Sequence, residues 1–308
     1  MDNRIYPVFL QEDFRNITKE SICILRPFLE NSKEDSCEFS LTNLYAWKDY
    51  CKTQYQIYND RLYIWFSDAD LLIFTTDRDK NNEPEAKELF TVSRAMKEAG
   101  HKGVFYQVRK ETLEKDPSFA DFFHITLCNE ETAEYIYDIK KLSRLPGQTL
   151  AKKRNLLHQF GRDHANVTTT ILTEKNWHKA KSLAEKWYSA YPGNKEDLAG
   201  EVASLANMEE CFHSTGLTGI LVEENGETLA FAAAAPITEK IWTETLEKAL
   251  PEHKGAAQFA NNELSKLLEE KCIYLNREQD LGLPGLRQAK LSYLPEYLLR
   301  NFVLTPKE

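Results

Sequence analysis

The residues best suited to chemistry stand close together in one short segment near the end of the chain. Asn276, Glu278 and Asp280 alternate along it, and Arg277 lies between the first two. In a strand, residues 276, 278 and 280 project to one side and Arg277 to the other. Two carboxylates and an amide could bind a substrate ammonium group, and one carboxylate could act as a general base. The alternative is a charged strand end that caps the turn at residues 282–285.

Other polar residues could add to this group. Glu247 stands with Glu244 near the end of a predicted strand, where an exposed strand end is the simpler explanation. Arg287 and Lys290 are three residues apart and could clamp a carboxylate or phosphate, or they could be solvated surface charges. Aromatic residues nearer the N-terminus could line a pocket but are more typical of a core. They are Tyr45 and Trp47, with Asn43 beside them.

A basic segment in the middle of the chain could bind a nucleic-acid end or a pyrophosphate. In the predicted helix 148–164, Arg154 and His158 share a face, whereas Lys152 and Arg154 diverge. Arg154 with Asn155 is the strongest candidate pair. Solvation of a charged helix face is the alternative. The basic positions are Lys140, Lys141, Arg144, Lys152, Lys153, Arg154 and Arg162.

The composition limits the classes of function. The 308 residues are 42% hydrophobic and 28% charged, as in ordinary folded proteins. The net charge of −9 argues against coating nucleic acid by bulk charge, but not against a local basic groove. The six cysteines show no C-x-x-C pair and no metal-ligand spacing, so no metal site is predicted. Because we find neither a signal peptide at residues 1–7 nor a membrane-spanning run, we expect a cytoplasmic protein.

The elements that must position these residues are clearest in the second half. Apolar spacing predicts helices at 175–191 and 201–213. Apolar runs at 217–222 and 228–235 flank an Asn-Gly turn, which is a strong hairpin signal. The remaining predicted elements are a strand at 241–246, a small-residue turn at 254–257, a helix at 258–271 and a strand at 272–275.

The first half repeats this order more faintly and without matching sequence. No linker rich in Pro, Gly or Ser separates the halves, so we expect one rigid body. We place the boundary between an N-terminal domain, residues 1–165, and a C-terminal domain, residues 166–308. The predicted elements are a hairpin at 54–58 and 62–66, strands at 71–74, 103–108 and 135–139, and a helix at 85–99.

Several segments together resemble one family, the C-terminal region of phosphatidylglycerol lysyltransferases and related stand-alone bacterial proteins. The block at 276–293 is the most specific of them. The resemblance implies an α/β fold with mixed (α+β) sheets, built as two tandem GNAT acyltransferase-like domains. The segments that carry it are 40–47, 137–139, 150–155, 246–250, 275–287 and 290–293.

The resemblance also implies a function, namely transfer of an aminoacyl group from aminoacyl-tRNA to an amine or hydroxyl of a small molecule or peptide. Glu278, Asp280 and Glu247 would then be catalytic. The lipid-modifying members carry a membrane-spanning N-terminal region that this sequence lacks, so a membrane lipid is not the expected acceptor. The expected substrate-binding residues are Asn276, Arg277, Arg287, Lys290, Tyr293, Lys152, Arg154 and Asn155.

One turn bears on the choice of donor. In GNAT domains the turn before the long helix presents N–H groups to a pyrophosphate, which would make Gly255, Ala256 and Ala257 cofactor-binding residues. Glu252 stands where such domains usually have Arg or Gln, and its charge should repel a pyrophosphate. CoA is therefore the weaker candidate donor. An acyl-CoA-dependent N-acyltransferase and a noncatalytic GNAT-fold binding module remain alternatives.

Overall fold

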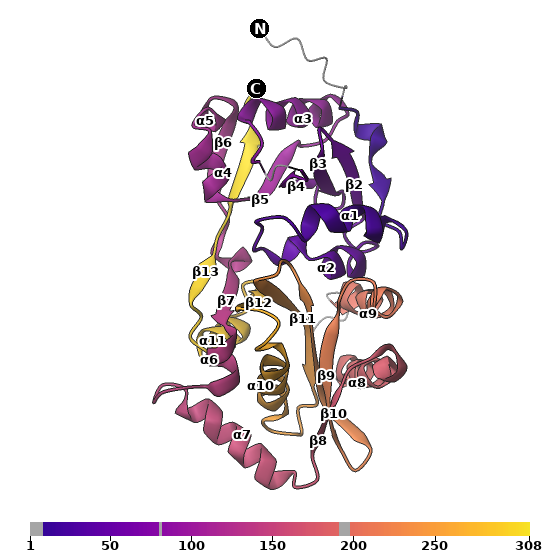
Figure 1. Ribbon diagram of the computed structural model, residues 1–308, viewed down its shortest axis with the longest axis vertical. Helices are drawn as coiled ribbons and strands as arrows, with labels where there is room; N and C mark the ends of the chain where they lie inside the picture. Colours follow the sequence, from indigo (N-terminus) through magenta and orange to yellow (C-terminus); the bar gives the residue numbers. More distant parts are fainter. Residues whose placement is uncertain (1–8, 80–81, 191–197) are drawn as a thin grey trace.

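The computed structural model describes residues 9–79, 82–190 and 198–308. It shows two bodies stacked along the long axis, each built on one mixed sheet of seven strands (Figure 1). The predicted helix 175–191 reaches one residue beyond the second of these ranges. The start at residues 1–7, where no signal peptide was found, lies outside them. No helix in the described ranges combines the length and apolar character that a bilayer crossing requires.

The first sheet has the strand order β1-β2-β3-β4-β5-β14-β6. Its strands are β1 (Arg15–Asn16), β2 (Thr53–Tyr58), β3 (Arg61–Phe66), β4 (Leu71–Asp77), β5 (Val104–Val108), β6 (Phe123–Leu127) and β14 (Phe302–Pro306). Its helices are α1 (Ser21–Leu29), α2 (Leu41–Ala46), α3 (Ala86–Glu98), α4 (Lys110–Lys115) and α5 (Phe119–Phe122), with 3-10 turns at Gln11–Asp13, Cys37–Phe39 and Glu130–Thr132.

The second sheet has the order β13-β7-β12-β11-β10-β9-β8. Its strands are β7 (Glu134–Asp138), β8 (Thr168–Ile171), β9 (Thr218–Glu224), β10 (Glu227–Pro236), β11 (Ile241–Ala249), β12 (Tyr274–Gln279) and β13 (Tyr297–Leu299). Its helices are α6 (Ile139–Arg144), α7 (Ala151–Asp163), α8 (Trp177–Ala190), α9 (Ala199–Cys211), α10 (Ala256–Leu268) and α11 (Pro284–Leu291), with a 3-10 turn at Glu174–Asn176.

Both predicted hairpins are confirmed, and their turns show why. Asn59 and Asp60 have φ of 50° and 57°, and Asn225 and Gly226 have φ of 51° and 86°. Two consecutive positive φ angles define the type I′ turn, whose twist matches that of the flanking strands. The predicted helices and strands of both halves are also present, with ends that differ by a few residues.

Small residues let helices close on both faces of the second sheet. Ala230, Ala232 and Ala234 of β10 belong to the core cluster that contains α10, while Ala233 and Ala235 belong to the cluster that contains α8. All five are completely buried. Figure 1 shows α10 on one side of the sheet and α8 with α9 on the other. The alanine-rich run is therefore the buried strand that its composition predicts.

The chain crosses between the bodies more than once. β7 precedes the predicted boundary at 165/166, yet it pairs with β12 and β13 of the second sheet. β14, the last strand, returns to the first sheet and lies between β5 and β6. One apolar cluster is shared by both bodies and includes Ile136 and Ile241. The division into 1–165 and 166–308 stays a prediction, because a single boundary does not describe this exchange of strands.

Candidate active site

The site forms where β11 and β12 separate. The two strands pair in parallel over Ile241–Thr243 and Tyr274–Asn276 and then diverge. Beyond Asn276 the register of β12 against β7 shifts, and Glu278 has a φ of 58°. A left-handed residue in a strand is a bulge, which re-aims the side chains that follow it.

The bulge corrects one prediction from the sequence. Asn276 and Glu278 do face the first body, but Asp280 lies on the opposite side, against Tyr135. Strict alternation would have kept all three together. It fails because the positive φ at Glu278 inserts a turn of the backbone between Asn276 and Asp280.

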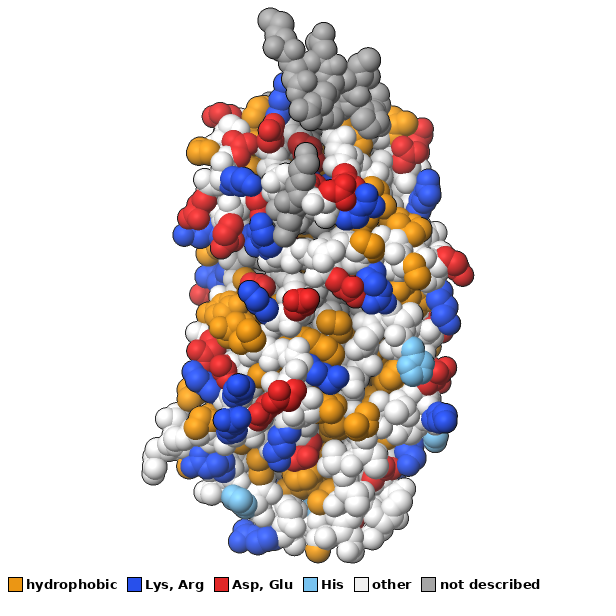
Figure 2. Space-filling model, in the orientation of Figure 1, with side chains coloured by type: hydrophobic (Ala, Val, Ile, Leu, Met, Phe, Trp, Pro, Cys, Tyr) orange, Lys and Arg blue, Asp and Glu red, His pale blue; other side chains and the backbone are white. Residues whose placement is uncertain are grey.

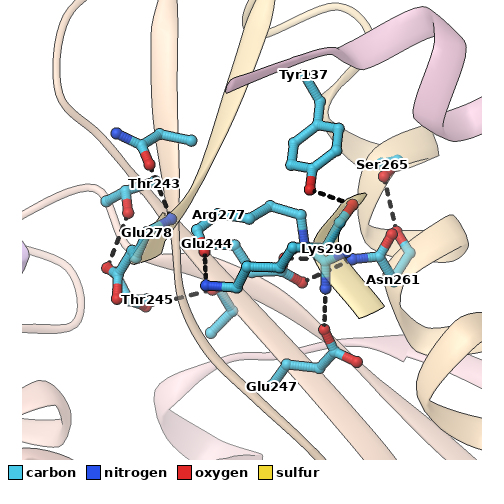
Figure 3. A network of polar contacts seen from close by, with 12 residues as sticks. Tyr137, Thr243, Glu244, Thr245, Glu247, Asn261, Ser265, Arg277, Glu278 and Lys290 are labelled. Atoms are coloured by element: carbon cyan, nitrogen blue, oxygen red, sulfur yellow. Dashed lines mark hydrogen bonds and ion pairs between the residues drawn. The ribbon is translucent and has the colours of Figure 1, made fainter. Parts of the chain in front are cut away.

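Arg277 joins the two diverging strands through a buried ion-pair cluster. Its Nε donates to Glu244 and its Nη2 donates to Glu247 Oε2 at 2.6 Å. Asn261 of α10 donates to both oxygens of Glu244, at 3.1 and 3.2 Å. Burial, with the charge of Glu244, raises the pKa of Glu247 to about 7 in spite of Arg277. Glu244 and Glu247 are thus parts of a cluster (Figure 3), not an exposed strand end.

Glu278 lies at the junction of the two bodies. Its Oε1 accepts hydrogen bonds from Asn43 Nδ2 at 2.8 Å and from Thr243 Oγ1 at 2.9 Å. Burial raises the pKa of Glu278 to about 7. Burial also raises the pKa of Glu38 to about 8, with the charges of Glu134 and Glu278 adding to the effect. The arrangement is an excess of carboxylates in a poorly solvated place, which is typical of functional sites.

Glu134, which the sequence analysis did not single out, ties this junction together. It is completely buried on β7. Its oxygens accept from Ser36 Oγ at 2.6 Å, from the Cys37 N–H at 2.8 Å and from Asn276 Nδ2. Burial raises its pKa although these bonds oppose the shift. No local pattern distinguishes Glu134 from the glutamates just before it, so only the tertiary structure identifies it.

Lys290 holds the bulge in place from α11. The ammonium group donates to the main-chain carbonyls of Arg277, at 2.6 Å, and of Gln279. These carbonyls flank Glu278, so the contacts fix the backbone that carries the carboxylate. Burial lowers the pKa of Lys290 to about 8, although the charge of Glu278 opposes the shift. Figure 3 shows Lys290 extended beside Arg277, with the Tyr137 hydroxyl bonded to its main-chain carbonyl.

Arg287 and Lys290 do not form a common clamp. Arg287 donates to Asp280 through Nε at 2.7 Å and Nη2 at 3.1 Å, whereas Lys290 faces the bulge. Asp280 also accepts from the Tyr135 hydroxyl at 2.5 Å and from the Gly282 N–H at 2.8 Å. The hydrogen bonds from Arg287 are the main reason that the pKa of Asp280 is lowered to about 2. Both oxygens of Asp280 are therefore engaged.

The basic helix α7 brings Lys153 to the site. Lys153 Nζ lies 4.0 Å from the centre of the Tyr293 ring, and the guanidinium of Arg277 lies 5.2 Å from the same ring. Arg154 donates to the carbonyls of Leu145 and Gly147 and so fastens the turn between α6 and α7. Lys152 and Asn155 are exposed. Lys153 is therefore the basic residue of this helix that contacts the cluster.

The turn before α10 is covered by protein. Gly255 has a φ of 95°, and a Cβ built there would lie 3.2 Å from Phe160 Cβ of α7. Ala256 is completely buried, and the Phe160 ring packs 4.9 Å from that of Phe259. In the first body the corresponding helix start is also occupied, because the Ala86 N–H donates to Asp116 Oδ2 at 2.8 Å. The start of each helix is therefore partly covered by the chain itself, and a CoA pyrophosphate at Gly255, Ala256 and Ala257 stays a prediction.

Comparison with solved structures shows what this arrangement is similar to. A conserved protein of unknown function from Bacteroides thetaiotaomicron is 26% identical, with a TM-score of 0.85 over 96% of this chain and 99% of that one. The C-terminal domain of a protein assigned as a lysylphosphatidylglycerol synthetase, from Agrobacterium fabrum, is 13% identical, with a TM-score of 0.66 over 94% and 92%. FemX is 9% identical, with a TM-score of 0.58 over 96% and 97%. The fold is thus mixed α/β with two tandem GNAT-like domains.

Sequence comparison identifies the family. An uncharacterised protein of Mycoplasmoides gallisepticum is 19% identical over 187 residues, and the match spans 59% of the length of that curated relative. The family model described as phosphatidylglycerol lysyltransferase, C-terminal, matches residues 29–305, which include every residue of the site. The chain therefore belongs to the phosphatidylglycerol lysyltransferase C-terminal family.

Proposed function

We propose that the protein is a cytoplasmic aminoacyltransferase that moves an aminoacyl group from aminoacyl-tRNA to an amine or hydroxyl of a small molecule or peptide. The observation that carries this proposal is the group of the partly buried Glu247 and Glu278 and the buried Lys290, whose pKa values of about 7, 7 and 8 lie near neutrality. A general base works best when its pKa is close to the ambient pH. Membership of the family supports the same class of reaction.

Glu278 is the base in this proposal. Its Oε1 is fixed by Asn43 and Thr243, and its Oε2 accepts no hydrogen bond from the described residues. An oriented carboxylate with one open oxygen is suited to take a proton from an incoming acceptor. Asp280, with both oxygens engaged, fits a positioning role, and so does Arg287, which holds it.

The transfer needs no covalent enzyme intermediate. The acceptor nitrogen or oxygen forms a bond to the carbonyl carbon of the aminoacyl ester while its proton passes to Oε2 of Glu278. The tetrahedral intermediate then expels the ribose oxygen of the tRNA, and that oxygen takes the proton as the ester C–O bond breaks. Asn276 and Lys290 keep the backbone of Glu278 in place during both steps.

The donor is proposed to approach over α7. Lys153 lies over the buried ring of Tyr293 next to Arg277 and offers positive charge to a phosphate of a nucleotide end. Lys152 and Asn155 extend this surface outward, while Arg154 holds the turn beneath it. The covered turn at Gly255–Ala257 supports a donor that does not depend on a pyrophosphate site.

A transfer assay tests the proposal. Purified protein is mixed with radiolabelled aminoacyl-tRNA and a panel of amines, amino sugars and peptides, and label released from tRNA is separated into transfer product and free amino acid. We expect label in a product, and at least a hundredfold slower transfer by Glu278→Gln, in the range of about 10² to 10⁴ that general bases contribute. Glu185→Gln, a change at an exposed position of α8, serves as the matched control and should transfer normally.

Binding measurements separate a wrong donor from a wrong acceptor. Filter binding over a salt series should show tighter, salt-sensitive binding of charged than of uncharged tRNA. If neither form binds at low salt, aminoacyl-tRNA is not the donor and the proposal fails. If the Glu278→Gln protein transfers at the normal rate, the assignment of the base fails.

A further inference from the structure

Glu134 differs from the charged side chains at the surface of the protein. On the face drawn in Figure 2, acidic and basic side chains are interspersed over both bodies, where water and opposite charges surround them. Glu134 is completely buried on β7, at the point where the second sheet meets Ser36 and Cys37 of the first body. A buried carboxylate is costly unless hydrogen bonds or an opposite charge compensate for the lost water. The partners of Glu134 therefore decide whether it carries a charge.

Every hydrogen-bond partner of Glu134 within the described ranges is a neutral donor. Its oxygens accept from the Ser36 hydroxyl at 2.6 Å and from the Cys37 N–H at 2.8 Å, and three side-chain amides complete the set. A protonated carboxyl needs an acceptor for its own hydrogen, and a set made only of donors offers none. The contacts therefore describe an ionised carboxylate. The three amides belong to Gln107, Asn276 and Gln279.

The orientation of the Asn276 amide is fixed independently of Glu134. Its Nδ2 donates to the Asp35 carbonyl at 3.0 Å, and its Oδ1 accepts from the Glu278 N–H at 2.8 Å. Nδ2 is therefore the atom that faces Glu134, and the Cys37 N–H on the same carboxylate oxygen can only donate. The Asn276 amide thus lies directly between the carboxylate of Glu134 and the backbone of Glu278.

Few cations oppose the charge of Glu134 at this junction. Lys290 is the one cation among the titratable groups that face Glu278, and its ammonium donates to main-chain carbonyls. Burial is the main cause of the raised pKa values of Glu278 and Glu38, about 7 and about 8, and the negative charge of Glu134 adds to both. The titratable groups that face Glu278 are Glu134 of β7, Cys37 and Glu38 of the 3-10 turn, and Lys290 of α11.

We propose that Glu134 is a positioning residue for the reaction: its ionised carboxylate holds Cys37 and Asn276 around Glu278 and directs a negative charge at the Glu278 carboxylate, which makes Glu278 a stronger base. A like charge near a carboxylate favours its protonated form. Because Glu134 is completely buried, it acts through Glu278 and not on a substrate. This role rests on the proposed function, in which Glu278 takes the proton of the acceptor.

An NMR titration of the glutamate carboxyl carbons tests the charge of Glu134 without any turnover. In the wild type, the Glu134 carboxyl should show the chemical shift of an ionised group at pH 7. Glu134→Gln keeps the size of the side chain and removes the charge. In this variant the pKa of Glu278 should fall from about 7 by at least about 0.5, and the pKa of Glu38 should also fall from about 8. Glu247, which is paired with Arg277, is the internal control and should keep its pKa of about 7.

Two further variants separate charge from structure. Glu134→Asp keeps the charge on a shorter side chain, so the pKa of Glu278 should stay closer to the wild-type value than in Glu134→Gln, even if the melting temperature falls further. A purely structural role for Glu134 predicts the reverse order of the two variants. Glu223→Gln removes another buried carboxylate, on β9, four strands away from β7 in the same sheet. It is the matched control and should leave the pKa of Glu278 unchanged.

The pH profile of transfer tests the role in the reaction. Its acidic limb should move to lower pH in Glu134→Gln by as much as the pKa of Glu278 does. An unchanged pKa of Glu278 in folded Glu134→Gln overturns the proposal. So does a wild-type Glu134 carboxyl that is protonated at pH 7, a result that needs no variant. Absence of transfer by the wild type would refute the proposed function instead, and the titration would still show whether the charge of Glu134 acts on Glu278.

Discussion

Each half of the molecule buries an arginine against a carboxylate of its sheet or central helix, Arg61 in the first half and Arg277 in the second, and these two clusters are balanced differently. In the first half Arg61 pairs with Glu88 of α3 at 2.9 Å. Its Nη1 donates to the main-chain carbonyls of Thr75, at 2.6 Å, and Asn82, at 3.1 Å. One cation meets one carboxylate, and Nη1 is satisfied by the backbone. Such a cluster holds β3, β4 and α3 together and leaves no group poised for proton transfer.

In the second half the carboxylates outnumber the cations around them. Arg277 meets both Glu244 and Glu247, and Glu278 lies next along the strand with only neutral hydrogen-bond donors. Lys290 is close enough to influence Glu278, but its ammonium donates to carbonyls. The comparison teaches that burying an arginine stabilises a fold, whereas burying more carboxylate than the cations can neutralise brings pKa values near 7.

The largest expected effect comes from removing the arginine in each half. Arg277→Met and Arg61→Met should each cost about 3–5 kcal/mol of unfolding free energy, because each leaves carboxylate buried without its partner. Transfer should fall at least about a hundredfold for Arg277→Met alone, since only that change alters the environment of the base. Urea denaturation and single-turnover transfer, measured on the same preparations, separate the two effects. Equal loss of transfer in both variants would abolish the distinction between the clusters.

The pH dependence should be opposite for stability and activity. In the folded chain the pKa values of Glu247 and Glu278 are raised from 4.5 to about 7. Between pH 4.5 and pH 7 the folded state therefore binds more protons than the unfolded state. Their contribution to stability is therefore present at pH 4.5 and lost as the pH rises towards 7. Transfer should instead fall about tenfold for each pH unit below 7, because the base must be ionised.

Variants test which carboxyl causes the pH dependence of stability. Glu278→Gln should reduce the slope of the melting temperature against pH between 4.5 and 7, because one of the carboxyls with a raised pKa is gone. A slope that Glu278→Gln does not change would mean that Glu278 does not titrate in this range.

Local patterns predicted much of the fold but not the site as a whole. The hairpin turns at Asn59–Asp60 and Asn225–Gly226 are encoded by residues that tolerate positive φ, and the structure has both. Glu278 also has a positive φ, but glutamate carries no such preference, so nothing in the sequence predicts the bulge. The predicted side of Asp280 was wrong for this reason.

Contacts between distant parts of the chain could not be predicted from the sequence either. Asn43 meets Glu278 across 235 positions, and Glu134 meets Asn276 across 142. Tertiary packing decides that β7 joins the second sheet and that β14 joins the first. The local sequence of each strand does not differ from that of any other buried strand, so it could not predict this. Asn43 was noticed only as a neighbour of aromatic residues, and Glu134 was missed.

A smaller effect is expected from α7. Lys153→Ala should weaken tRNA binding several-fold and reduce the slope of log K against log salt by about 1, as the loss of one phosphate contact does. Arg154→Ala should instead lower the melting temperature, because Arg154 fastens the turn at Leu145 and Gly147. Filter binding and thermal unfolding of both variants distinguish the roles. A normal salt slope for Lys153→Ala would remove α7 from the proposed donor site.

The smallest expected effect is a null response to acetyl-CoA, and it bears on both halves at once. The start of α10 is covered by Phe160, and the start of α3 is capped by Asp116. The Phe160 side chain occupies the first of these sites and the Asp116 carboxylate the second. A pyrophosphate would have to displace that group at the site where it binds. A ligand at about 100 times its dissociation constant adds about 2.7 kcal/mol to the stability of a protein that binds it only when folded. We therefore expect saturating acetyl-CoA to move the melting temperature by less than about 1 °C, where binding would raise it by several degrees. A dose-dependent rise that Asp116→Asn enlarges would place CoA at the start of α3 in the first half. A rise that Phe160→Ala enlarges would place CoA at the start of α10 in the second half.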